Sequence, residues 1–127
     1  MKTEYINIQP YITKDSSEVR ELMHPNINSD MPPDMNGVRN QSLAEAIVPM
    51  GANTLLHRHI KTEEIYHISQ GRGKMTLGEE SFNIKTGDTV CISPGTPHMV
   101  KNTGTVLLKI LCCCSPAYSH EDTKLCK

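Results

Sequence analysis

Aromatic side chains and long apolar segments are scarce in this sequence. Its 127 residues include one Phe, four Tyr and no Trp, against seven Met. A core made from this composition has to be filled mainly by aliphatic and thioether side chains. No apolar run approaches the roughly 20 residues that a membrane-spanning helix needs, which argues against a membrane protein. The length predicts a single domain, because domains typically hold roughly 100 to 200 residues.

Excess charge, an export signal and paired cysteines are also lacking. Lys and Arg total 13 and Asp and Glu total 14, and without a basic patch nucleic acid is not an expected partner. Residues 1–15 alternate polar and apolar side chains without the apolar segment of a signal peptide, so we expect a cytoplasmic protein. The odd count of five Cys predicts free thiols and not a disulfide framework.

No long segment has helical periodicity, whereas short runs of alternating polar and apolar residues recur between turn residues. The sequence therefore predicts an all-β fold, and about ten short strands at close spacing suggest a sandwich or barrel. Asp15 and Glu18 also have the spacing of a helix cap, so the segment after them could instead be helical. The predicted strands are 4–9, 19–23, 41–48, 54–59, 63–69, 73–77, 81–84, 88–92, 98–101 and 106–114.

The domain is expected to span 1–127, with its core barrel at about 38–114. An N-terminal segment, 1–23, precedes this core, and a polar tail, 115–127, follows it. Residues 24–37 carry three Pro, three Asn and two Asp, a composition that predicts a loop. Such a loop could be a lid over a pocket or a plain connection.

Three histidines and a carboxylate have the spacing of a metal site. His57 and His59 are two residues apart in a strand-like segment, so both imidazoles should point to one face. Glu64 begins the next strand pattern, and a short reversal could bring it to the two histidines. His98 follows a turn in which Pro97 restricts the backbone. Three imidazoles and one carboxylate suit one divalent Fe, Mn, Ni, Co, Cu or Zn ion and leave coordination positions open.

Two segments around these residues resemble the sequence motifs of the cupin family. The segment GANTLLHRHIKTEEIYHISQG, from Gly51 to Gly71, is similar to the first motif in every spacing. The segment GDTVCISPGTPHMVKN, from Gly87 to Asn102, resembles the second motif and departs from it at Ser93, where the family usually has a proline. The resemblance implies a single-domain cupin, that is, a jelly-roll β-barrel. The family's habit also implies a homodimer, in which the predicted strand 4–9 could cover an exposed sheet edge.

The resemblance also implies a ligand set. Carried over to this chain, the metal ligands of the family fall on His57, His59, Glu64 and His98. Glu63 is the alternative carboxylate, because the motif tolerates three or four spacer residues, but Glu64 leaves the correct gap to Gly71. A barrel that keeps these motifs without binding metal is the alternative interpretation.

Tyr66 and His67 follow Glu64 closely, and strand parity assigns them to opposite faces. Tyr66 shares the face of Glu64, which would place its phenol near the metal as a hydrogen-bond donor or general acid. An ordinary core tyrosine is the competing interpretation. His67 has the opposite parity, so it is predicted to face away from the site.

Charged and sulfur-containing residues elsewhere are ambiguous. Arg20, Glu21 and Glu45 could line the pocket, where Arg20 would bind a carboxylate or phosphate of a substrate. We favour solvated positions for all three, since charged side chains are mostly exposed. Residues 112–114 are all Cys, and the alternation of a strand places the first and third on one face. Core packing is the favoured role for these three and for Cys91.

These features predict a metal-dependent enzyme that acts on a small polar or anionic molecule. Sugar-phosphate isomerases and dioxygenases are among the enzymes that cupins of this size resemble, and the fold does not choose the reaction. Isomerisation would use Arg20 to hold an anionic group, whereas oxygenation would need Fe(II) with two open positions. The alternatives are a binding or sensing module without turnover, or a metal with a structural role.

Overall fold

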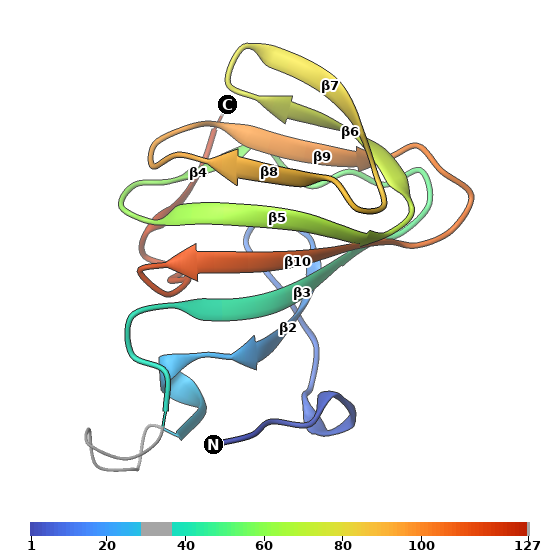
Figure 1. Cartoon of the computed structure of the whole chain (residues 1–127). Helices are drawn as coiled ribbons and strands as arrows, with labels where there is room; N and C mark the ends of the chain where they lie inside the picture. The colour runs from blue at the N-terminus through green and yellow to red at the C-terminus, as the bar shows by residue number, and fades with distance from the viewer. Residues whose placement is uncertain (29–36, 127) are drawn as a thin grey trace.

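A computed structural model describes residues 1–28 and 37–126 of the chain. These residues form two antiparallel sheets that face each other, as the jelly-roll prediction requires (Figure 1). The first sheet contains, in spatial order, β1 (Tyr11–Ile12), β2 (Glu18–Met23), β3 (Ser42–Val48), β10 (Leu108–Ser115), β5 (Glu63–Gln70) and β8 (Thr89–Ile92). The second contains β11 (Thr123–Leu125), β4 (His57–His59), β9 (His98–Asn102), β6 (Arg72–Leu77) and β7 (Glu80–Lys85).

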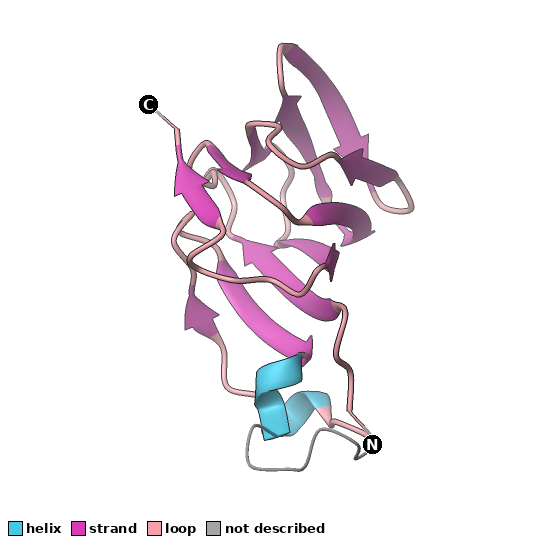
Figure 2. Cartoon of the chain, turned by 90° about the vertical axis from the view of Figure 1, so that its left-hand side faces the viewer, coloured by secondary structure: helices cyan, strands magenta, loops and turns pink. Residues whose placement is uncertain are grey.

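Two short 3₁₀ helices, η1 (Tyr5–Asn7) and η2 (Pro25–Asn28), complete the described structure. Both lie at the end of the molecule where the N-terminus is found (Figure 2). The predicted loop 24–37 begins with η2, and its residues 29–36 lie outside the described part of the chain. Among the described residues, no helix has the length and apolar character needed to span a membrane.

The space between the sheets is apolar at one end and polar at the other. Along β10, the inward side chains change from Leu108 and Ile110 to Cys112 and Cys114. The register pairs Ile110 with Ile68 and Cys114 with Glu64, so β5 changes in the same direction. Burial of each large aliphatic side chain contributes about 1.5–3 kcal/mol to folding, so the apolar end stabilises the barrel. The buried histidines lie at the polar end.

Most of the predicted strands are present, with shifted ends, but the strand predicted over 4–9 is wrong. Tyr5–Asn7 is helical, and Ile6 is 86% exposed, so this segment has no buried face for a strand to cover. The alternating pattern of this segment therefore does not correspond to a strand. The homodimer stays a prediction, but its predicted contact through strand 4–9 has no support. The segment after Asp15 is strand β2, and the alternative helix is not formed.

The two ends of the barrel also differ from the prediction. β4 is limited to three residues, because the backbone N–H of Leu55 donates to the carbonyl of Asp15 at 2.7 Å instead of to a neighbouring strand. The polar tail contains an unpredicted strand, β11, which pairs with β4 and sets Thr123 opposite His59. Three polar-rich residues carry too little pattern for a strand to be predicted there.

Candidate metal centre

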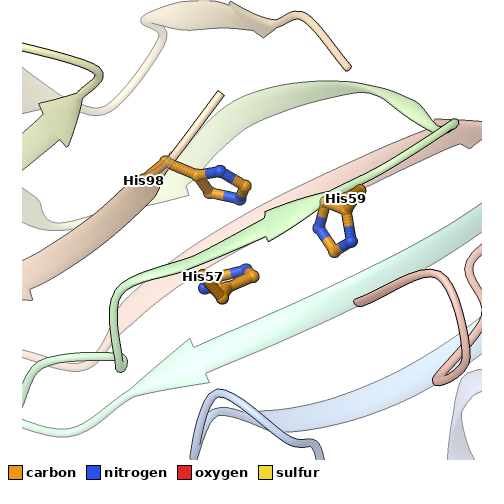
Figure 3. A group of neighbouring side chains, drawn as sticks. All are labelled: His57, His59 and His98. Atoms are coloured by element: carbon orange, nitrogen blue, oxygen red, sulfur yellow. The ribbon is translucent and has the colours of Figure 1, made fainter. Parts of the chain in front are cut away.

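Three buried imidazoles converge between the sheets. His57 and His59 both point inward from β4, because two residues along a strand return to the same face. His98, at the first position of β9, lies directly opposite His57 in the register. Figure 3 shows the three rings turned toward one another. One ring nitrogen from each of these histidines lies within 4.8 Å of the other two.

The turn before β9 fixes the position of His98. Gly95 has a φ of 81°, a conformation that side-chain-bearing residues avoid, and its N–H donates to the carbonyl of His59 at 2.6 Å. The carbonyl of Ser93 accepts from the N–H of Thr96 at 3.2 Å, so the turn forms although Ser93 replaces the family's proline. The second motif therefore joins the two histidine strands through backbone contacts.

Hydrogen bonds at the outer nitrogen of each ring determine where its proton lies. Nδ1 of His57 is 2.8 Å from the carbonyl of Leu55, and Nδ1 of His98 is 2.9 Å from the carbonyl of Thr96. A carbonyl can only accept, so both Nδ1 atoms donate, and in a neutral ring Nε2 keeps its lone pair. Hydrogen bonds of this kind hold metal-binding histidines in the correct tautomer.

His59 is held in the same tautomer by β11. Its Nδ1 is 3.0 Å from Oγ1 of Thr123, and that hydroxyl donates its own proton to the carbonyl of Ser119 at 2.9 Å. Oγ1 therefore accepts from the N–H of His59, which leaves the lone pair of Nε2 directed at the centre of the site. No signal in the polar tail marked Thr123 for this role.

Glu64 supplies a carboxylate to the same centre, whereas Glu63 is exposed. Oε1 of Glu64 lies 3.2 Å from Nε2 of His59 and 3.5 Å from Nε2 of His98. The thiol of Cys114 donates to the other oxygen, Oε2, across 3.2 Å. Burial opposes ionisation of Glu64, but the hydrogen bonds and positive charge that His59 and His98 supply when protonated outweigh it and lower its pKa to about 2.

Burial lowers the pKa of His57, and the neighbouring ring of His98 lowers it further. This keeps His57 in the neutral form that a metal ligand needs. In Glu64, Oε1 is buried without a hydrogen-bond partner among the described residues, and the same is true of Nε2 of His98. Acceptor atoms that converge in this way, with no donor between them, fit a bound cation.

A small cavity opens on the histidines from the face of the first sheet. The centre of a water molecule can occupy about 40 Å³ of it. One water needs roughly 10–15 Å³ of space open to its centre, so the cavity has room for a few water-sized groups. The cavity is lined by carboxylates, hydroxyls, thiols and small apolar side chains, among them Glu21, Ala44, Tyr66, Cys112, Tyr118 and Thr123.

Tyr66 lies where strand parity predicts, inside the cavity and against the site. Its ring centre is 5.9 Å from that of His98, with the rings nearly perpendicular. Burial raises the pKa of Tyr66 well above its usual value, and the negative charge of Glu64 adds to this effect. The phenol therefore keeps its proton at neutral pH and can donate it in a hydrogen bond.

Arg20 is not brought to the site. Val19 and Glu21 line the cavity, so Arg20 between them points to the opposite face of β2. There its guanidinium lies 5.0 Å from the ring centre of Tyr5, next to Glu45 in the sheet register. Arg20 therefore cannot reach a substrate held in this cavity.

Glu21 faces the cavity instead of solvent, which differs from the expected solvated position. Its Oε1 accepts a hydrogen bond from the hydroxyl of Tyr11 at 2.8 Å, while Oε2 is buried without a partner among the described residues. Burial raises the pKa of Glu21, although the bond from Tyr11 partly offsets this effect. Strand parity could have found Glu21 only if the inward face of β2 had been known.

A second carboxylate, Asp15, reaches the histidines from the turn before β2. Its Oδ2 lies 3.4 Å from Nε2 of His57, and both side chains are nearly inaccessible to solvent. In the sequence, the spacing of Asp15 and Glu18 indicates only a helix cap. A single acidic residue in a polar turn has no spacing that relates it to histidines more than 40 residues away.

His67 is exposed and bonds to Thr89 on the outer face, as its parity predicted. Cys112 and Cys114 point inward, and burial raises the pKa of both thiols. The prediction of core packing is wrong for Cys91, which is exposed because β8 buries the residues on either side of it.

Comparison with known proteins places this geometry in a family. The family model described as "Cupin domain" matches residues 44–114. An uncharacterized protein of Methanocaldococcus jannaschii is 59% identical over 125 residues, which cover 98% of this chain and 94% of that protein.

Two solved structures share the fold. The crystal structure of a predicted oxalate decarboxylase from Thermotoga maritima aligns with a TM-score of 0.73, at 24% identity, over 91% of this chain and 99% of that one. The nucleoside dehydratase Pac13 from Streptomyces aligns with a TM-score of 0.76, at 11% identity, over 100% of this chain and 91% of that one.

Proposed function

Because the chain belongs to the cupin family, we propose that it is a metal-dependent enzyme that catalyses proton transfer on a small, uncharged polar molecule. His57, His59, Glu64 and His98 are the proposed metal ligands. The observation that carries the proposal is the convergence of three imidazoles whose outer nitrogens are each engaged by a hydrogen bond, which leaves the inner nitrogens free to bind.

The ligand set suits a divalent Mn, Fe, Co, Ni, Cu or Zn ion. When bound, such an ion polarises a carbonyl or hydroxyl oxygen and lowers the pKa of a bound water. The role of the chain is to hold the ligands in one protonation state and to surround them with a small cavity. Cys114 contributes by occupying Oε2 of Glu64, which leaves Oε1 to face the imidazoles.

The cavity favours a small and uncharged substrate. Its lining includes Asp15, Glu21 and Glu64 but no Lys or Arg among the described residues. A phosphate or dicarboxylate would therefore meet no cationic side chain, and only the metal ion, whose charge these carboxylates offset, could hold it. This argues against a sugar phosphate, since Arg20 lies on the outer face.

Two side chains in the cavity support proton transfer. Tyr66 lies in the cavity beside His98 and keeps its proton at neutral pH, so its hydroxyl can donate to a substrate oxygen. Glu21 has an unpartnered carboxyl oxygen and a raised pKa, which is suitable for accepting and returning a proton. Groups of this kind serve isomerisation or elimination more directly than oxygenation. The fold of the structural relatives does not decide between these reactions.

The test is solvent isotope exchange. The Mn²⁺-loaded protein is incubated in D₂O with a panel of small uncharged hydroxy-carbonyl compounds, and carbon-bound deuterium is followed by NMR. Wild-type protein should incorporate deuterium into one class of compound, and Tyr66→Phe should slow this by about 10²–10⁴-fold, the usual contribution of a general acid. The control variant His67→Phe, on the outer face, should exchange at the wild-type rate.

Other outcomes would contradict this assignment. Consumption of dioxygen by the Fe²⁺-loaded protein, without deuterium exchange, would favour a dioxygenase. Saturable binding of a compound with neither reaction would favour a sensing or binding module.

A further inference from the structure

Asp15 is held in a turn that leaves one of its carboxylate oxygens available. Its Oδ1 accepts from the backbone N–H of Ser17 at 3.1 Å, from the hydroxyl of Ser17 at 2.7 Å and from the hydroxyl of Thr13. The turn is closed by Ser16, whose φ of 74° is strained for a residue with a side chain. These contacts saturate Oδ1 and fix the direction of Oδ2.

Oδ2 faces a ring nitrogen that has no proton to donate while His57 is neutral. It lies 3.4 Å from Nε2 of His57. A neutral His57 has its proton on Nδ1, where the carbonyl of Leu55 accepts it, so Nε2 presents a lone pair to the carboxylate. Two acceptors that face each other in a buried space repel unless a cation lies between them. No described Lys or Arg side chain lines the cavity to supply one.

The two buried carboxylates are arranged in a complementary way around the imidazoles. Glu64 contacts His59 and His98, whereas Asp15 contacts His57. Together they bring two negative charges to a site that would hold a divalent ion, so the occupied centre would carry no net charge. A neutral centre is the less costly one to bury.

We propose that Asp15 is a fifth protein ligand of the metal ion, through Oδ2. The inference rests on the proposed metal site and adds the N-terminal segment to it. Five protein ligands, three nitrogens and two oxygens, exceed the four of a tetrahedral zinc site and suit the higher coordination numbers of Mn²⁺, Fe²⁺, Co²⁺ or Ni²⁺. One position of an octahedron remains for a substrate or water. Oxygenation that needs two adjacent open positions would then be disfavoured.

Asp15→Asn is the informative variant, because it should move two measurements in opposite directions. The amide oxygen can still accept from Thr13 and Ser17, while the amide N–H₂ replaces Oδ2 and can donate to Nε2 of His57. Metal-free Asp15→Asn should therefore unfold at the same temperature as the wild type or higher. Its affinity for Mn²⁺, measured from the EPR signal of the free ion, should fall at least about 100-fold, the upper range for groups that only orient a ligand.

Water-proton relaxation by bound Mn²⁺ gives an independent readout. Loss of Asp15 from the metal should admit a water, so the relaxivity of the Mn²⁺-loaded variant should rise above that of the wild type. Glu63→Gln is the matched control, because it removes one negative charge from the exposed neighbour of Glu64, on the outer face of β5. It should leave both the affinity and the relaxivity close to the wild-type values.

The remaining outcomes separate the inference from the function on which it rests. Wild-type protein that binds no Mn²⁺ would remove the metal site and this inference together. Equal Mn²⁺ affinity of wild type and Asp15→Asn would remove the fifth ligand alone. A lower unfolding temperature of the metal-free Asp15→Asn, with unchanged affinity, would instead identify Asp15 as the partner of a protonated His57.

Discussion

Replacement of Thr123 by valine should weaken metal binding although Thr123 is not one of the proposed ligands. Its hydroxyl donates to the carbonyl of Ser119 and accepts from Nδ1 of His59. Valine has a similar shape and no hydroxyl, so His59 would lose the acceptor that holds its proton on Nδ1. The proton could then move to Nε2, where Oε1 of Glu64 lies 3.2 Å away and would accept it.

The magnitude follows from this change of tautomer. Loss of an outer hydrogen bond of a metal-binding histidine typically weakens binding 10–100-fold, or about 1.4–2.8 kcal/mol. Folding should lose about 1–3 kcal/mol, because the carbonyl of Ser119 is left without its donor. The new bond from His59 to Glu64 would recover part of this cost in the metal-free protein. The loss of Mn²⁺ affinity should therefore persist even at temperatures where the variant is fully folded.

The assay is titration of metal-free protein with Mn²⁺ beside a thermal unfolding curve. Thr123→Ser is the control, because it keeps the hydroxyl and should bind within a few-fold of the wild type. An affinity of Thr123→Val equal to that of the wild type would refute the argument that β11 sets the tautomer of His59.

Two further perturbations have defined outcomes. Asn102→Ala should lower the free energy of unfolding, measured by urea denaturation, by about 3 kcal/mol or more. The variant removes the hydrogen bonds of the Asn102 side chain to the carbonyls of Val48 and Val106 and to the N–H of Gly104. A loss below about 1 kcal/mol would contradict this. Between about pH 4.5 and 2 the folded metal-free protein binds fewer protons at Glu64 than the unfolded chain, since the pKa falls from 4.5 to about 2. Its stability should therefore decline as the pH falls through this range, and the same urea series should show a shallower decline for Glu64→Gln.

Much of the barrel could be predicted, because alternation of apolar residues is a direct consequence of strand geometry. Burial alternates along all eight residues of β5 and of β10, and both strands lie in the structure almost where they were expected. Alternation alone did not distinguish the exposed segment at Tyr5–Asn7 from a strand, since pairing depends on a neighbour that the local sequence does not specify. For the same reason, three-residue β11 gave no signal.

Only some residues of the candidate site could be predicted from the sequence. The positions of His57, His59, Glu64 and His98 followed from motif spacing and parity, and the structure brings all four side chains together. Thr123 and Asp15 approach the site from the two ends of the chain, so their proximity depends on the completed fold. Arg20 and Glu21 are adjacent in sequence and both were expected in solvated positions, because the local sequence does not specify which face of β2 points inward.

Metal content per chain is the most direct test of the account. Protein purified without an affinity tag or chelator would be analysed by elemental mass spectrometry, beside the double variant His57→Ala/His98→Ala. We expect about one equivalent of a transition metal in the wild type and almost none in the double variant, with both proteins showing a cooperative unfolding transition. Equal metal content in the two proteins, or a wild type that stays metal-free after reconstitution, would contradict the proposed centre.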